Sequence, residues 1–83
     1  MQNDGYSYRA VEVIQLLEPH AQAEIEWLRI TMLSKLATNG RARVTRNTAE
    51  TEYRFDWKDR HISIEFYLRA RDGMAVIFGI DKI

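Results

Sequence analysis

The sequence contains no cysteine. Disulfide bonds, thiolate metal sites and cysteine nucleophiles are therefore excluded, and the lack of disulfides is typical of a reducing compartment. There is also no apolar run of transmembrane length, and residues 1–5 are polar, unlike the start of a signal peptide. We therefore expect a cytoplasmic protein that makes no membrane contact.

The chain has no excess of charge of either sign. Twelve Lys and Arg residues balance twelve Asp and Glu residues, which gives a net charge of zero. Neutrality argues against a dedicated nucleic-acid binder, and it leaves no electrostatic repulsion to oppose self-association. The 83 residues are enough for one domain, 1–83, with a thin hydrophobic core.

Motifs for catalysis and for cofactor binding are missing as well. His20 and His61 have no accompanying metal-ligand spacing, and the four glycines do not form a phosphate loop. Asp56, Asp59 and His61 surround one predicted hairpin and could form an acid–base group, although charged residues commonly occupy hairpins. We predict no catalytic residues, no metal ligands and no cofactor, and hence a protein that is not an enzyme.

The one proline, Pro19, separates two helical patterns. Apolar residues at three- and four-residue steps predict a first helix that begins at Asp4 or Ser7 and ends before Pro19. A second helix is predicted from Pro19 to Thr38, because the Asn39-Gly40 pair is a strong C-terminal signal.

The second helix is apolar on two sides. One predicted stripe consists of Ala21, Ile25, Leu28, Met32 and Leu36. The other stripe carries Trp27 and Ile30, and a helix that is apolar on two sides must be covered on both. One side can pack on the sheet. The Trp27 and Ile30 side requires the first helix, a second copy of the chain or a protein partner.

The second half of the chain alternates between apolar and polar residues, as strands with one buried face do. This pattern predicts four strands, Arg41–Arg46, Glu52–Lys58, His61–Arg69 and Met74–Ile80. The predicted inward side chains are Ala42, Val44, Tyr53, Phe55, Trp57, Ile62, Ile64, Phe66, Leu68, Met74, Val76, Phe78 and Ile80.

The same alternation restricts the turns, since paired residues of an antiparallel ladder point to the same face. Trp57 should pair with Ile62, which leaves residues 58–61 as a four-residue loop or residues 59–60 as a two-residue loop. Ala70 should lie opposite Met74, with a three-residue turn 71–73, and Arg46 opposite Thr51. The result is a meander of order 1-2-3-4 with two N-terminal helices on one face, a two-layer α+β domain.

The other face of this sheet is predicted to be open. The candidate partner-binding residues on it are Arg41, Arg43, Arg54, Tyr67, Arg69 and Ile77. The arginines of residues 41–46 admit three interpretations: a phosphate-binding strand, an edge strand protected by charge, and a protein-binding arginine patch.

These observations favour a small non-enzymatic protein-interaction module of the adaptor or inhibitor type. Its protein partner would bind the open sheet face or the helix face with Trp27 and Ile30, and a homodimer through the helix face is a secondary hypothesis. The alternative is a nucleic-acid-associated protein that binds phosphates through the arginines of the sheet. A small hydrolase or nuclease around Asp56, Asp59 and His61 is the third hypothesis.

Overall fold

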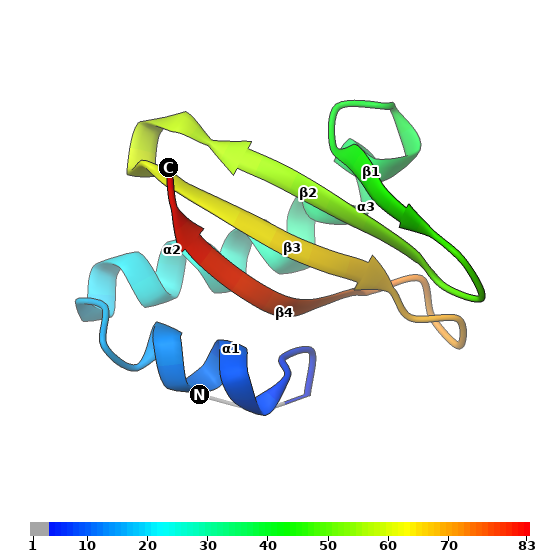
Figure 1. Ribbon diagram of the computed structural model, residues 1–83. Coiled ribbons are helices and arrows are strands. Elements are labelled where there is room, and N and C mark those ends of the chain that lie inside the picture. The colour runs from blue at the N-terminus through cyan, green and yellow to red at the C-terminus, as the bar shows by residue number, and fades with distance from the viewer. Residues whose placement is uncertain (1–3) are drawn as a thin grey trace.

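The computed structural model describes residues 4–83 and shows three helices before a four-stranded antiparallel sheet (Figure 1). The elements are α1 (Tyr8–Ile14), α2 (Pro19–Thr31), α3 (Leu33–Thr38), β1 (Arg43–Asn47), β2 (Thr51–Trp57), β3 (Ile62–Leu68) and β4 (Ala75–Lys82), with a 3-10 turn, Lys58–Arg60, between β2 and β3. The strand order β1-β2-β3-β4 confirms the predicted meander and the α+β class.

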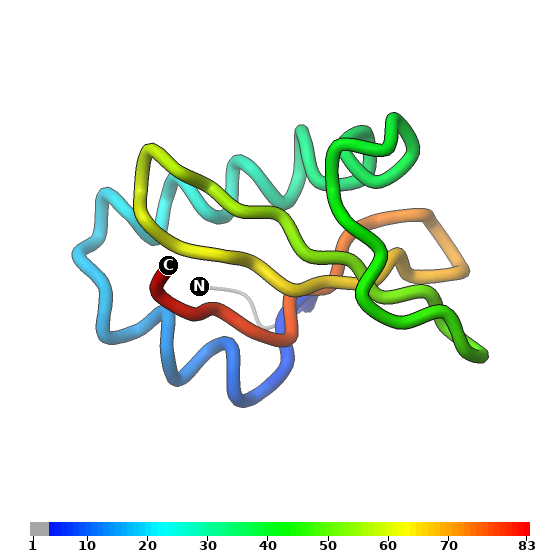
Figure 2. Tube along the Cα trace, turned by 45° about the horizontal axis from the view of Figure 1, so that its top comes forward, coloured from blue at the N-terminus to red at the C-terminus, as the bar shows by residue number. Residues whose placement is uncertain are grey.

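The helices lie at two places relative to the sheet. Both views show α2 and α3 running along one face of the sheet, while α1 lies beside β4 (Figures 1 and 2). The core fills the space between them. Its largest fully buried side chains are Phe66, Ile14, Ile25, Leu33, Ile64 and Ile77.

Helix α1 begins where the sequence predicts and ends early. The Ser7 hydroxyl accepts a hydrogen bond from the Ala10 amide at 3.2 Å, so Ser7 is the N-cap. Ala10 and Ile14 are fully buried. The helix stops at Ile14, several residues before Pro19, and Leu16 is left exposed in the following turn.

The predicted helix from Pro19 to Thr38 is interrupted at Met32. Its φ of −122° separates α2 from α3, although the Met32 amide still donates to the Leu28 carbonyl at 2.9 Å. The two helices therefore continue in nearly the same direction. Gly40, with φ of 73°, ends the segment as expected from its left-handed conformation.

The register of β2 on β3 is confirmed. Trp57 pairs with Ile62, Phe55 with Ile64, and Tyr53 with Phe66. The Tyr53 and Phe66 rings stack with their centroids 5.4 Å apart.

The register of β3 on β4 is correct at one end and wrong at the other. Ile64 pairs with Ile80 as predicted, but a β-bulge next to Glu65 shifts the remaining pairs by one residue. Phe66 therefore pairs with Ile77 instead of Phe78. As a result Ile77 is fully buried in the core, and the prediction that it lies on the open face is wrong.

The same shift changes the open face and the turn. Phe78 leaves the predicted core face and its ring stacks on Tyr67, with 6.3 Å between centroids. Val76 pairs with Tyr67 and so shares its face, but its side chain is buried, with 8% exposed. The Arg69 amide donates to the Met74 carbonyl, so the turn has four residues, 70–73, and the predicted three-residue turn is wrong.

Strand β1 is shorter than predicted and also has a bulge. It begins at Arg43, so Arg41 precedes it. Arg43 pairs with Arg54 as predicted, but the register then shifts and Arg46 pairs with Glu52 instead of Thr51. All five residues of β1 are exposed, including Val44, which was predicted to point inward.

Candidate functional site

The predicted sheet-face arginines are not equivalent, and Arg54 is already engaged. It lies opposite Glu65 in the register, yet its guanidinium donates to Asp56 at 3.1 Å on its own strand. Glu65 instead lies over Gly79, where an added Cβ would be 3.1 Å from its Oε1. Arg54 therefore already has a carboxylate partner on its own strand, and both side chains of this pair are partly exposed.

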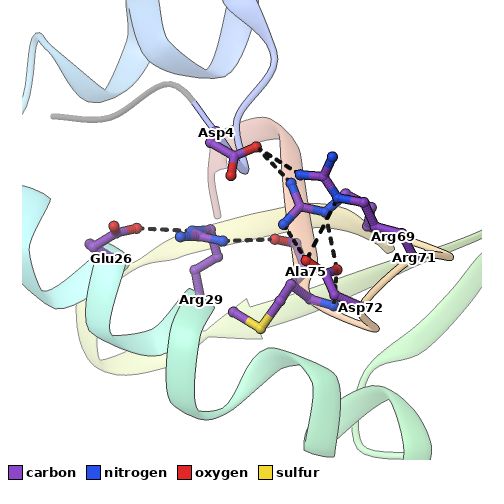
Figure 3. Close-up of polar contacts among 8 residues, drawn as sticks. Asp4, Glu26, Arg29, Arg69, Arg71, Asp72 and Ala75 are labelled. Carbon is purple, nitrogen blue, oxygen red and sulfur yellow. Dashed lines mark hydrogen bonds and ion pairs between the residues drawn. The ribbon is translucent and has the colours of Figure 1, made fainter.

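Arg69 is engaged more fully at the β3–β4 turn. It donates to Asp72 at 2.6 Å and to Asp4 at 2.7 Å, and Arg71 adds a longer contact to Asp4 at 3.6 Å (Figure 3). The hydrogen bond from Arg69 lowers the pKa of Asp72 from 3.8 to about 2. Arg69 thus joins the turn to the N-terminal segment.

That segment, residues 4–7, covers the outer edge of β4. The Ile77 amide donates to the Gly5 carbonyl and the Ser7 amide donates to the Ile77 carbonyl, each at 2.9 Å. Tyr6 and Ile77 form a parallel β-bridge. The edge groups of β4 at this position are therefore satisfied within the chain.

Side chains of α2 also contact residues 4–7 and the start of β4. The Tyr6 hydroxyl donates to Glu26. Arg29 donates to Glu26 at 2.9 Å and to the Ala75 carbonyl at 3.2 Å (Figure 3). Burial, together with the hydrogen bond to Glu26, raises the pKa of Tyr6 above its ordinary value of 10. Gly5 adopts φ of 107°, and an added Cβ would lie 2.6 Å from Arg29 Cζ. The backbone and Arg29 therefore meet in a space that accepts no side chain.

Strand β1 has the opposite character. Arg41, Arg43 and Arg46 are all exposed, and no ion pair between residues 4 and 83 includes any of them. Arg43 pairs with Arg54 and Arg46 pairs with Glu52, two residues away on β2. Since alternate residues of a strand share a face, the bulge brings Arg43 and Arg46 to the same open face.

The outer edge of β1 is also unoccupied. β1 pairs with β2 on one side only, and within the described part of the chain no backbone hydrogen bond reaches its other side. An edge strand presents a row of unpaired amide and carbonyl groups. Arg41, Arg43 and Arg46, which have no ion-pair partner, therefore lie at or next to a strand edge whose backbone donors and acceptors are also unpaired.

The helix face with Trp27 and Ile30 is exposed. Trp27 is 57% and Ile30 52% exposed, although α1 was one of the candidates to cover them. That interpretation is wrong, because α1 lies beside β4 instead (Figure 2). One helical turn before Trp27, a shallow pocket of about 260 Å³ opens on α2, and its lining residues are Pro19, Gln22, Ala23 and Glu26.

A second hollow lies where α1 meets β4. It has a volume of about 380 Å³ and is lined by Arg9, Val13, Glu65, Phe78, Gly79, Ile80 and Asp81. The lining combines one guanidinium, two carboxylates and apolar groups.

Two of the residues that could take part in acid–base chemistry, His20 and Asp56, have charged partners within the chain. His20 contacts Glu24 at 2.8 Å on α2, and Asp56 is bound by Arg54. His61 is exposed and adopts φ of 55° in the β2–β3 connection. No group of three or more His, Cys, Asp or Glu residues among residues 4–83 could hold a metal ion.

The comparisons with known proteins do not add a relative. No family model, no curated protein and no solved structure matches the chain. Between residues 4 and 83 no helix has both the length and the apolar character needed to cross a membrane.

Proposed function

We propose that the chain is a non-enzymatic protein-interaction domain whose β1 strand binds an extended acidic segment of a protein partner. The observation that carries this proposal is the coincidence of an unpaired strand edge with unpaired arginines. The backbone of a bound segment would add a strand to the sheet, and its side chains would be selected by charge.

The arginines of β1 differ from most others in the chain. Arg29, Arg54, Arg60, Arg69 and Arg71 all have a carboxylate partner within the chain. Arg43 and Arg46 have none, and the bulge places them on one face at the border of the sheet. A planar guanidinium binds a carboxylate through two parallel hydrogen bonds, so this pair suits Asp or Glu side chains of a partner.

Charged residues on an edge strand also protect against edge-to-edge aggregation. The two roles differ in what they require of the side chain. Protection needs only charge, which lysine supplies equally well. Recognition of carboxylates uses the guanidinium fork, so replacement of Arg43 and Arg46 by lysine would keep the protein monodisperse yet weaken binding.

The test begins with 12-residue peptides selected on the wild-type protein from a random display library. We expect the selected peptides to be rich in Asp and Glu. We further expect the double variant Arg43→Glu/Arg46→Glu to lose about tenfold or more in affinity, which corresponds to about 1.4 kcal/mol or more. A peptide with its acidic residues changed to lysine should bind the double variant instead. Arg9→Glu is the matched control, because Arg9 is exposed and unpaired on α1.

Methylation of alternate backbone amides of the selected peptide tests strand addition. Loss of binding upon methylation at one set of alternate residues, and not at the other, is the expected result. Selected peptides without acidic residues, or an affinity that Arg43→Glu/Arg46→Glu leaves unchanged, would contradict the proposal. If short DNA or RNA binds, and its affinity falls steeply with salt while no peptide binds, the nucleic-acid alternative is favoured.

A further inference from the structure

We propose that the hollow between α1 and β4 binds a small zwitterion, an α-amino acid with an apolar side chain. Arg9 would hold its carboxylate, and Glu65 and Asp81 would hold its ammonium group. The hollow lies at the edge of the sheet opposite β1 (Figure 1). The proposal therefore does not depend on peptide binding at β1, and Arg9→Glu remains a control for that binding.

The hollow has the size of a small-molecule site. Its volume of about 380 Å³ is near the lower end of the range for ligand pockets, which runs from about 300 to 1,000 Å³. Its charged groups come from different elements. Arg9 belongs to α1, whereas Glu65 and Asp81 belong to β3 and β4.

The three charged side chains of the hollow are unpaired. No ion pair between residues 4 and 83 includes Arg9, Glu65 or Asp81, although opposite charges line the same space. Arg9 therefore reaches neither carboxylate. A ligand that carries a carboxylate and an ammonium group can contact both sides at once, with charge-assisted hydrogen bonds at each end.

The two carboxylates share one face of the sheet with a buried hydroxyl. Ser63 pairs with Asp81 and precedes Glu65 by two residues, so the register places all three on the same face. The Ser63 side chain is fully buried, and its hydroxyl has no hydrogen-bond partner among the described residues. An unpaired buried hydroxyl costs free energy. It can donate to whichever of the neighbouring carboxylates turns to bind an ammonium group, and so fix its position.

Gly79 gives the Glu65 side chain room to reach the hollow. Gly79 pairs with Glu65, and an added Cβ would lie 3.1 Å from Glu65 Oε1 and 3.4 Å from Glu65 Cβ. The Glu65 side chain therefore extends across β4 towards α1, over a residue that has no side chain of its own.

The rest of the lining is apolar. Val13, Phe78 and Ile80 complete the hollow together with Gly79. Such a surface favours a ligand that also carries an aliphatic or aromatic group, because burial of apolar surface contributes to binding. An α-amino acid with an apolar side chain carries the two charges and the apolar group on one carbon atom.

The test begins with L-leucine, L-methionine and L-phenylalanine, each titrated into the isotope-labelled full chain and followed by NMR. We expect saturable shifts of the backbone amide signals of Val13, Gly79 and Asp81. Glycine, which has no apolar side chain, should bind more weakly. The amide of the tightest ligand lacks the carboxylate, and its N-acetyl form lacks the ammonium group. Each of these two analogues should bind about tenfold more weakly or worse.

Variants then match each charge of the ligand to its residue. Arg9→Gln should weaken the amino acid about tenfold and leave the affinity of its amide unchanged. Glu65→Gln/Asp81→Asn should weaken the amino acid and leave the affinity of its N-acetyl form unchanged. Glu12→Gln is the matched control, because Glu12 is an exposed residue of α1 outside the lining. The amide spectrum of each variant verifies that it is folded.

Three outcomes would overturn the proposal. The first is that none of the three amino acids gives a saturable shift at millimolar concentration. The second is that the amide binds as tightly as the amino acid, which would reduce the site to a general attraction of cations. The third is that folded Arg9→Gln binds the amino acid as tightly as Glu12→Gln does.

Discussion

The two edges of the sheet, β4 and β1, differ in how their backbone groups and arginines are used. At β4, residues 4–7 bond to the edge, and Arg69 is held between Asp4 and Asp72. At β1, the outer edge has no described partner and Arg43 and Arg46 have no carboxylate. The sheet therefore closes one edge with its own chain, whereas among the described residues the other edge has no partner strand.

The comparison also separates two kinds of arginine that look alike in the sequence. An arginine that already binds two carboxylates would have to release them before binding a partner, which costs free energy. An exposed arginine without such contacts has only water to release. Whether an arginine is already paired or still free depends on its position in the sheet and, for Arg69, on its proximity to Asp4.

The largest effect is expected from breaking the closed edge at Arg29. Arg29→Met keeps much of the apolar stem but removes the guanidinium donor from the Ala75 carbonyl and leaves Glu26 with the Tyr6 hydroxyl alone. We expect the free energy of unfolding to fall by about 2–3 kcal/mol, as for the loss of charged hydrogen bonds at a partly buried site. Urea denaturation measures it. An unchanged midpoint would contradict the role given to Arg29.

A smaller effect is expected from Asp72, and it depends on pH. Its pKa is lower in the folded chain than its ordinary value, so its contribution is present above pH 3.8 and is lost as the pH falls towards about 2. Asp72→Asn should therefore lower the melting temperature at neutral pH and flatten the acid limb of the stability curve. Thermal melts between pH 2 and 7 measure this, with Asp59→Asn as the exposed control. Parallel curves for wild type and Asp72→Asn would contradict it.

The smallest effect on stability is expected at the open edge. Arg43→Gln/Arg46→Gln should change the free energy of unfolding by less than about 0.5 kcal/mol, since both side chains are exposed and unpaired. A slight gain is consistent with the removal of a like charge opposite Arg54. Arg69→Gln is the matched comparison and should destabilise the protein more. Equal losses for the two edges would remove the distinction between them.

The sequence predicts the fold class, the strand order and the register of β2 on β3. These features follow from local alternation, and neither β2 nor its pairing with β3 contains a bulge. The errors in β1 and β4 come from one extra residue in each ladder, a choice that alternation alone does not reveal. In β4, Gly79 lies next to the bulge, and glycine within a strand often accompanies a bulge.

The candidate site is less predictable than the fold. Arg41 and Arg43 lie on the surface as predicted, whereas the exposure of Trp27 and Ile30 decides against the alternative that the first helix covers them. The burial of Ile77 and the capture of Arg69 do not follow from any local pattern. The first follows from the bulge in the β3–β4 ladder, and the second depends on Asp4, which lies 65 residues earlier in the chain.

The bulge in β1 has a consequence for changes in chain length. If Thr45 were deleted, the ladder would become regular and Val44 would be followed directly by Arg46. Arg43 and Arg46 would then stand two residues apart and would stay on the same side of the sheet, opposite Arg54 and Glu52. The deletion would remove the irregularity of the strand without moving the positive charge to another surface. The register of β1, as much as its composition, determines where the charge of this edge is presented.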